Sequence, residues 1–391
     1  MNGIFHLRGR VKHYDWGGTT FIPGLLGIKN PEQEPFAEYW LGTHQLGVSD
    51  VEISDGHFQS LPELTGPVAY LFKALEVKDM LSIQVHPSKK SAELEFAREN
   101  KAGIPADAPS RNYKDDNHKP ELIVALSDYW LLHGFKPAEE LHDILLNVPA
   151  LRFLQAVFIE QGYAGMYKLV MEMPQEEVNL HLQPLLDEII PAYKAGKLDK
   201  NAEDFWAARA GLTYCDAGYI DRGIFSIYLF NIVKLKKGEG LFQDAGVPHA
   251  YLEGKNIEIM ANSDNVLRGG LTRKHIDVKE LMKHIILQAT FPNVLPGEVL
   301  ASGERVYRTT ATEFELSLFE LEAGQTMEFQ PAGAEMLLLA EGNSAGSSGE
   351  KTILLQAGQP AAIVFPGAAC TLTATEKSLV FRAVKPVHIR E

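Results

Sequence analysis

The chain has 391 residues, 45% of them hydrophobic and 23% charged, which suits about two or three globular domains. Its net charge of −14 would repel a polyanion such as DNA, so we expect no nucleic-acid partner. No apolar run is long enough to span a membrane, the N-terminus lacks the apolar core of a signal peptide, and only two cysteines occur. We therefore expect a cytoplasmic protein with no membrane segment and no disulfide framework.

Two aromatic stretches open the chain. Trp16 is followed by two glycines, which indicates a turn with a large aromatic side chain beside it. This side chain belongs either to a core or to the wall of a substrate pocket. Residues 35–44 form a strand-like aromatic run in which Glu38 is the single carboxylate. Glu38 could either anchor the structure or belong to a functional site, and both roles remain open.

Residues 81–87 alternate apolar and polar side chains, the polar ones being Ser82, Gln84 and His86. Successive strand side chains point to opposite faces, so these three share one face. A hydroxyl, an amide and an imidazole suit water or a site better than a dry core. Gln84 and His86 lie two residues apart, so both can reach one point in front of the strand, such as a metal ion.

A helix and a second strand with a polar face follow. Ser88 is a suitable N-cap for a helix over residues 88–100. After a polar loop, residues 119–126 have a strand pattern that places Lys119 and Glu121 on one face. A second strand thus carries groups useful for chemistry.

Residues 136–210 differ, because their apolar side chains recur at helical spacing. We interpret this block as a helical module inserted between strands. We expect its two histidines, His142 and His181, to lie at the surface and not to bind a metal.

Strand patterns then return, and His249 and Tyr251 share one strand face. A tight turn after this strand would bring Glu258 back beside His249. The expected elements are a strand over 224–230, strands over 231–236 and 238–245, a strand over 247–253, a turn at 254–256, a return strand over 257–262 and a helix over 277–287.

From about residue 291 the chain consists of short strand patterns separated by turns rich in Gly, Pro and Ser. This spacing predicts a small barrel or sandwich. Its only histidine is His388, for which we expect a structural or interface role.

Four of the polar side chains form a suitable metal-ligand set: Gln84, His86, Glu121 and His249. Imidazole and carboxylate ligands suit zinc and other divalent first-row metals, whereas calcium or magnesium would require more oxygens. With one carboxylate, a divalent ion keeps a net charge of about +1, which favours polarisation of a substrate oxygen. Their spacing alone also permits four unrelated polar residues, each satisfied separately.

Several motifs resemble those of the type I mannose-6-phosphate isomerases. They occur in the family's order over residues 10–290, and they are residues 14–17, 37–44, 82–87, 117–122, 248–252 and 262–272. The resemblance implies a mainly β fold with an α-helical insertion. It implies a cupin-like jelly-roll catalytic domain (1–135 and 220–290), a helical domain (136–219) and a C-terminal jelly roll (291–391).

The resemblance also implies one zinc ion per chain, held by the four ligands named above. The implied reaction interconverts mannose 6-phosphate and fructose 6-phosphate through a cis-enediol, and we expect a monomer. The family's phosphate-side residues fall on Ser82, Lys119, Arg268 and Lys274, with Arg268 also near the reacting carbons.

Proton transfer between C1 and C2 requires a base, for which Glu258, Lys119 and Asp264 are candidates. We favour Glu258, because the expected hairpin places it near His249. Asp264 could instead orient Arg268. Tyr251 is expected to line the pocket, and Trp16 to form part of its wall.

Two other classes of protein remain open. Another cupin-type metalloenzyme, such as an oxygenase, would usually have more imidazole ligands and a redox-active metal. A non-catalytic sugar-phosphate-binding protein would keep the site without turnover, although the complete set of ligands and cations argues against this.

Overall fold

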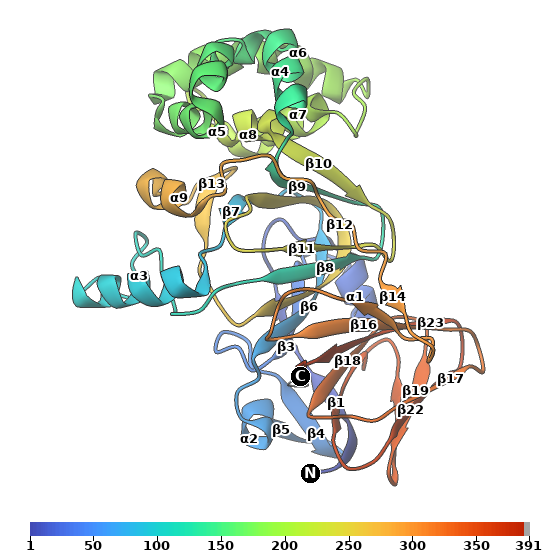
Figure 1. The fold of residues 1–391 in the computed structure, drawn as a ribbon. Coiled ribbons are helices and arrows are strands. Elements are labelled where there is room, and N and C mark those ends of the chain that lie inside the picture. The colour runs from blue at the N-terminus through green and yellow to red at the C-terminus, as the bar shows by residue number, and fades with distance from the viewer. Residues whose placement is uncertain (387–391) are drawn as a thin grey trace.

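The computed structural model describes residues 1–386, and the chain is mainly β. Helices α4 (Ala138–Asn147) to α8 (Gly223–Leu229) are inserted between strands β9 (Tyr129–Phe135) and β10 (Phe230–Leu235). In Figure 1 the green helical block lies at one end, the central strands lie in the middle and the orange to red C-terminal strands lie at the other end. This arrangement confirms the predicted fold class. None of the helices within 1–386 combines the length and the hydropathy that crossing a membrane requires.

Ten hydrogen-bonded strands form the central sheet, named the barrel, that carries the predicted site. They are β2 (Arg10–Lys12), β3 (Glu38–Gly42), β6 (Tyr70–Val77), β7 (Ile83–Val85), β8 (Glu121–Ala125), β9 (Tyr129–Phe135), β10 (Phe230–Leu235), β11 (Gly240–Gln243), β12 (His249–Ala261) and β13 (Leu267–Gly270).

Strand β12 joins the two sides of this barrel. Its first residues pair with β7 and β9, and its later residues pair with β6 and β8. The predicted turn at 254–256 is therefore wrong, because the chain continues as one strand through a bulge between Tyr251 and Glu253. Gly254 makes this path possible: its φ is +136°, and a Cβ there would lie 2.8 Å from the carbonyl oxygen of Asp128.

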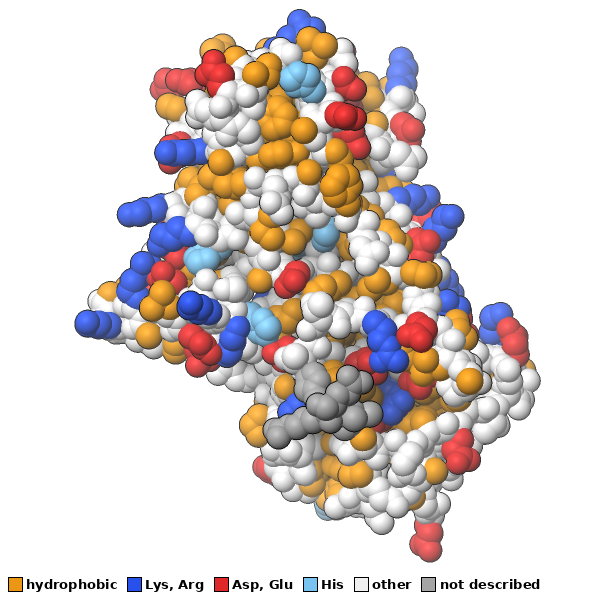
Figure 2. Space-filling model, in the orientation of Figure 1, with side chains coloured by type: hydrophobic (Ala, Val, Ile, Leu, Met, Phe, Trp, Pro, Cys, Tyr) orange, Lys and Arg blue, Asp and Glu red, His pale blue; other side chains and the backbone are white. Residues whose placement is uncertain are grey.

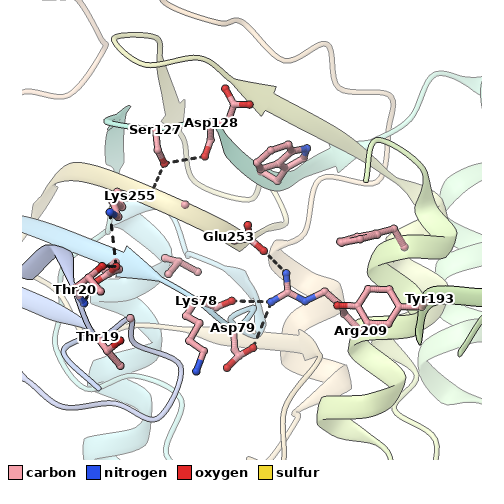
Figure 3. Close-up of a pocket in the computed structure, with 16 residues that line it drawn as sticks. Thr19, Thr20, Lys78, Asp79, Ser127, Asp128, Tyr193, Arg209, Glu253 and Lys255 are labelled. Atoms are coloured by element: carbon pink, nitrogen blue, oxygen red, sulfur yellow. Dashed lines mark hydrogen bonds and ion pairs between the residues drawn. The ribbon is translucent and has the colours of Figure 1, made fainter. Parts of the chain in front are cut away.

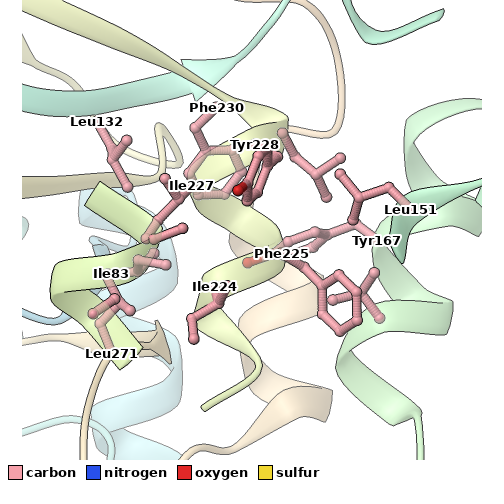
Figure 4. Packing of buried hydrophobic residues seen from close by; sticks show 14 of the residues in the cluster. Ile83, Leu132, Leu151, Tyr167, Ile224, Phe225, Ile227, Tyr228, Phe230 and Leu271 are labelled. Carbon is pink, nitrogen blue, oxygen red and sulfur yellow. The ribbon is translucent and has the colours of Figure 1, made fainter. Parts of the chain in front are cut away.

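The helical block packs on the outer face of the barrel. The elements are α4 (Ala138–Asn147), the 3-10 turn η1 (Pro149–Leu151), α5 (Leu154–Glu172), α6 (Gln175–Lys194), α7 (Glu203–Tyr214) and α8 (Gly223–Leu229). Figure 4 shows Ile227 of α8 on the side of the barrel residues Leu132 and Ile83, and Phe225 on the side of Tyr167 and Leu151, all within one buried cluster.

Helix α8 replaces the strand predicted over 224–230. Every residue of α8 is buried, so no polar face reveals the helical period. A short apolar run of this kind does not distinguish a buried strand from a buried helix, and the surrounding packing decides.

The C-terminal strands form two further sheets, and three N-terminal strands join the larger one at β21. The larger sheet contains β14 (Glu298–Val299), β15 (Arg305–Tyr307), β16 (Glu315–Leu321), β23 (Ser378–Val384), β18 (Glu335–Glu341), β21 (Ala361–Phe365), β1 (Gly3–Arg8), β4 (Asp50–Ser54) and β5 (His57–Ser60). The smaller contains β17 (Thr326–Phe329), β22 (Cys370–Ala374), β19 (Ser344–Ser348) and β20 (Lys351–Leu355). The predicted domain boundaries stay a prediction, and His388 lies outside the described residues.

The remaining helices are α1 (Phe21–Leu25), α2 (Leu61–Thr65), α3 (Lys89–Lys101) and α9 (Val278–His284). Helix α3 confirms its predicted cap, since Ser88 Oγ accepts a hydrogen bond from the backbone N–H of Ser91. Acidic and basic side chains are interspersed over the face shown in Figure 2, so the net negative charge forms no single patch on that face.

Candidate active site

Three predicted metal ligands converge at one end of the barrel. His86 directly follows β7, Glu121 begins β8 and His249 begins β12. His86 Nε2 lies 3.5 Å from Glu121 Oε1, and His249 Nε2 lies 3.3 Å from Glu121 Oε2. One ligand atom from each residue lies within 4.8 Å of the other two, and all three side chains are buried. Such a cluster has the size and donor set of a zinc site.

Backbone carbonyls orient both imidazoles toward Glu121. Nδ1 of His86 lies 2.8 Å from the carbonyl oxygen of Asn265, and Nδ1 of His249 lies 2.9 Å from that of Val247. A carbonyl oxygen only accepts, so Nδ1 carries the proton in each ring and Nε2 offers its lone pair to the cluster. His86 Nε2 is buried without a hydrogen-bond partner among residues 1–386, as expected for a group that faces a metal position.

The charges at the cluster favour the metal-binding protonation states. Burial lowers the pKa of His86 to about 4, so this ring is neutral near neutral pH. Burial alone would raise the pKa of Glu121, but Lys119 and the imidazoles hold it well below the usual range. Lys119 Nζ lies 2.9 Å from Glu121 Oε1. The carboxylate is therefore ionised.

Gln84, the fourth predicted ligand, lies beside this cluster. It stands opposite His249 where β7 pairs with β12, and opposite Arg268 where β7 pairs with β13. Directly opposite residues in antiparallel strands point to the same face. The Gln84 amide thus shares a face with both His249 and Arg268.

A pocket of about 440 Å³ lies next to Gln84. Five of the predicted site residues line it: Trp16, Ser82, Gln84, Arg268 and Lys274. Arg268 and Lys274 form no ion pair with a carboxylate within the described part of the chain. Partial burial lowers the pKa of each, and in Lys274 the neighbouring Arg268 contributes to the same shift. This pocket therefore holds cationic groups that are available to an anion.

Tyr251, which was expected to line the pocket, and Glu258 are not among the residues that line it, and both are buried. Glu258 is buried, with Oε2 2.7 Å from Lys73 Nζ and Oε1 2.8 Å from the Tyr251 hydroxyl. The same hydroxyl lies 3.2 Å from Glu121 Oε2. Tyr251 thus joins Glu258 to the ligand cluster. Glu258 and His249 share strand β12 rather than the two arms of a hairpin.

Asp264 has a partner other than the one considered from the sequence. Its Oδ2 lies 3.3 Å from Nε2 of His44, and its backbone N–H donates to Asp115. Burial alone would raise the pKa of Asp264, but His44 and Lys119 lower it. Asp264 is thereby held by His44, not by Arg268.

Sequence reasoning missed Lys73, which lies between two acids. Besides Glu258, it lies 3.8 Å from Glu38, a residue that lines the pocket and also accepts a hydrogen bond from the Trp40 indole. Burial alone would lower the pKa of Lys73, but Glu258 and Glu38 raise it. A lysine within the mostly apolar strand β6, whose other charged residue is Glu76, was the available signal, because a buried lysine needs a carboxylate partner.

The histidines of the helical block take no part in the cluster. His142 is exposed, as expected. His181 is half-buried and stacks on Phe153, with 3.8 Å between ring centroids.

A larger pocket of about 680 Å³ lies elsewhere, between the barrel and the helical block (Figure 3). Arg209 of α7 reaches into it, where it forms an ion pair with Glu253, donates to the carbonyl of Lys78 at 2.7 Å and lies 3.3 Å from Asp79. These contacts attach the helical block to the barrel. None of the predicted site residues lines this pocket, so size alone does not identify the site.

Comparison with known proteins agrees with this geometry. Residues 4–138 match the family model described as phosphomannose isomerase type I, catalytic domain. The mannose-6-phosphate isomerase of Salmonella typhimurium is 34% identical over 374 residues, covering 90% of this chain and 93% of the relative. That of Escherichia coli (strain K12) is 35% identical over 376 residues, with the same coverage of 90% and 93%.

The same family appears among solved structures. A crystal structure of the Salmonella typhimurium enzyme, bound to its substrate fructose 6-phosphate and a zinc atom, superimposes with a TM-score of 0.86 at 30% identity. The match covers 98% of this chain and 100% of that chain. The chain therefore belongs to the type I phosphomannose isomerase family.

Proposed function

We propose that this protein is a zinc-dependent aldose–ketose isomerase that interconverts mannose 6-phosphate and fructose 6-phosphate. The observation that carries the proposal is the buried cluster of His86, Glu121 and His249 beside a pocket that contains two cations without carboxylate partners within residues 1–386. A metal site next to an anion pocket suits a phosphorylated sugar. The name and the bound substrate of the structural relative support the same assignment.

The residues at the cluster fit a zinc ion. We assign Gln84, His86, Glu121 and His249 as its ligands, with one ion per chain. The oriented Nε2 atoms and the ionised carboxylate support this set, and the position of Gln84 opposite His249 supports an amide oxygen as the fourth ligand. When bound, the ion would supply positive charge that stabilises a substrate oxygen as negative charge develops on it.

The cations of the pocket would bind the substrate's phosphate and orient the sugar. We assign Ser82 and Lys274 to the phosphate, and Arg268 to the reacting end because it lies opposite Gln84 across the β7–β13 pair. Trp16 stacks against Tyr14 and lines the same pocket, which supports a role as a wall for the sugar. In a chain of net charge −14, these local cations are what an anionic substrate needs.

Glu258 is our candidate for proton transfer between C1 and C2. Burial raises its pKa although Lys73 opposes this, and a raised carboxyl pKa brings a base closer to working pH. Lys119 is already engaged with Glu121, and Asp264 with His44, which favours Glu258 over both. Lys73 forms ion pairs with both Glu258 and the pocket-lining Glu38. These two ion pairs link the buried Glu258 carboxylate to the wall of the pocket.

The Tyr251 hydroxyl couples the hydrogen bonding of Glu258 to that of Glu121. It has one proton, whereas both Glu258 Oε1 and Glu121 Oε2 lie within hydrogen-bond distance of it. When Glu258 takes up a proton, it can donate to the Tyr251 oxygen while Tyr251 donates to Glu121. Glu121 and Glu258 therefore compete for the Tyr251 proton when Glu258 is ionised, and Glu121 receives this hydrogen bond alone when Glu258 is protonated.

A coupled assay that follows fructose 6-phosphate formation from mannose 6-phosphate tests the proposal. Activity should disappear after treatment with a chelator and return with zinc. An oxygenase is the alternative to test. Such an enzyme was expected to have more imidazole ligands, but two imidazoles and one carboxylate also form the ligand triad of non-heme iron oxygenases. Oxygen consumption that depends on iron, with no fructose 6-phosphate formed, would support that alternative. Zinc binding without turnover would indicate a binding protein.

Two expectations from the sequence stay predictions. They are a monomeric state, which gel filtration with light scattering would measure, and a cytoplasmic location.

A further inference from the structure

Two polar side chains outside the predicted site lie at the level of the metal ligands. His133 of β9 stands directly opposite His249, and Gln243 of β11 stands directly opposite Glu121. Opposite residues of an antiparallel pair point to the same face, with Cβ atoms about 4.5–5.5 Å apart. Both side chains therefore point into the barrel next to a ligand.

These two side chains also lie near each other. The ligands that they oppose are neighbours, since His249 Nε2 lies 3.3 Å from Glu121 Oε2. His133 and Gln243 therefore flank the same ligand cluster from β9 and β11. Together, His133 and Gln243 form one polar group on the inner side of the ligand cluster.

Neither side chain has its hydrogen-bonding needs met by protein groups. His133 is 5% exposed and Gln243 is 0% exposed, yet both ring nitrogens of His133 and both polar atoms of Gln243 lack a partner among residues 1–386. A buried polar group left unsatisfied costs about 1–3 kcal/mol. Four such atoms at one place indicate a bound polar partner, and an ordered water with two to four hydrogen bonds is the usual one.

The side chains around this position offer enough hydrogen-bond donors and acceptors to bind an ordered water molecule. Burial lowers the pKa of His133 to about 4, so the neutral ring offers one N–H donor and one acceptor nitrogen. Gln243 adds an N–H₂ donor group and a carbonyl acceptor. The adjacent Glu121 carboxylate accepts further hydrogen bonds, whereas Nδ1 of His249 is already engaged with Val247.

We propose that His133 and Gln243 are positioning residues for the metal centre, which bind ordered water behind the ligands and through it fix the Glu121 carboxylate. Groups that hold a metal ligand from behind typically change metal affinity by about 10–100-fold. The inference rests on the proposed zinc site and concerns how tightly this chain binds the ion.

Competition of the protein with a zinc-chelating dye measures the effect directly. Gln243→Met keeps the length of the side chain but removes its hydrogen bonds, and it should weaken zinc binding by about 10–100-fold. The melting temperature of the metal-free variant should stay the same or rise, because a buried amide without a partner from the protein is replaced by an apolar group. His133→Leu should act in the same direction, and His133→Gln, which restores a donor and an acceptor, should recover most of the affinity.

Asn256→Leu is the matched control. Asn256 is also a fully buried amide with both polar atoms unpaired within residues 1–386, but it stands opposite Leu75 and Ala125, away from the ligands. This variant should leave zinc affinity within twofold of wild type, as about 0.4 kcal/mol is the corresponding free-energy limit.

The outcomes separate this inference from the proposed function. If the wild type binds zinc and isomerises the sugar phosphate while folded Gln243→Met and His133→Leu bind zinc equally well, only the positioning role is overturned. If Asn256→Leu weakens zinc binding as much as Gln243→Met does, the effect is general to the barrel and the inference is also overturned. If the wild type binds no zinc, the proposed function itself fails.

Discussion

Lys73 and Glu258 form an ion pair inside the barrel, with 2.7 Å between Nζ and Oε2 and with 7% and 2% of the side chains exposed. Strands β6 and β12 hold these two residues directly opposite each other. The pair joins the pocket-lining Glu38 on one side to Tyr251 and the metal ligand Glu121 on the other. Its first consequence concerns stability, because a buried charge without a partner is strongly unfavourable.

Lys73→Met should destabilise the metal-free protein by about 3–5 kcal/mol, since it leaves Glu258 buried without its partner. Urea unfolding at neutral pH measures the difference. Adding Glu258→Gln to Lys73→Met removes the uncompensated carboxylate and should recover part of the loss. An equal loss in the single and the double variant would contradict this coupling.

Glu258→Gln alone should lower kcat by about 10²–10⁴-fold, the usual contribution of a general base. Zinc content should remain at that of wild type, because Glu258 reaches the ligand cluster only through the Tyr251 hydroxyl. Glu121→Gln serves for comparison, since it removes a ligand and should reduce both bound zinc and turnover. Turnover near wild type in Glu258→Gln would reject Glu258 as the base.

Substitutions of the two pocket cations should have different kinetic effects. Arg268 lies opposite Gln84, so Arg268→Gln should mainly lower kcat, by about 10²–10³-fold as for other groups that stabilise developing charge. Lys274 is exposed at the edge of the pocket, so Lys274→Gln should mainly raise KM, by about tenfold for a loss of about 1.4 kcal/mol of binding. Steady-state kinetics with mannose 6-phosphate distinguishes the two. A reversed pattern would exchange the two roles.

Low pH should weaken the contacts that Glu280 makes between α9 and the rest of the chain, such as its hydrogen bond from Tyr113. Burial alone would raise the pKa of Glu280, but Lys283, Tyr113 and His284 lower it from 4.5 to about 2. A folded-state pKa below the unfolded value stabilises the protein above pH 4.5, and this contribution is lost as the pH falls toward about 2. The difference in melting temperature between wild type and Glu280→Gln should therefore shrink over this range. A constant difference would show that Glu280 does not titrate as described.

Local patterns were enough to predict much of the fold and the first part of the site. The alternation of residues 81–87 predicts that Gln84 and His86 share a strand face, since side-chain direction in a strand depends only on the neighbouring residues. In the structure Gln84 stands opposite His249, and His86 lies within the cluster. The Ser88 cap and the helical block were likewise predicted from local spacing. Motif resemblance supplied what spacing did not, namely that Glu121 and His249 belong to the same site.

Other features depended on contacts between distant parts of the chain. The apolar run of α8 was predicted as a strand. Burial on all sides removes the polar face from which the period of a helix could be told from that of a strand. The run through Gly254 was predicted as a turn, because a glycine that lets two backbones approach has the same sequence signal as one that reverses the chain.

Short segments of the chain are enough to show which residues have metal-binding chemistry and which strand face carries Gln84 and His86, since both are local properties. The partner that stands opposite each side chain depends on the folded arrangement of the strands: Lys73 stands against Glu258, His133 against His249 and Gln243 against Glu121. Strand pairing sets these relationships over separations of more than a hundred residues, where local periodicity carries no information about the partner or the register.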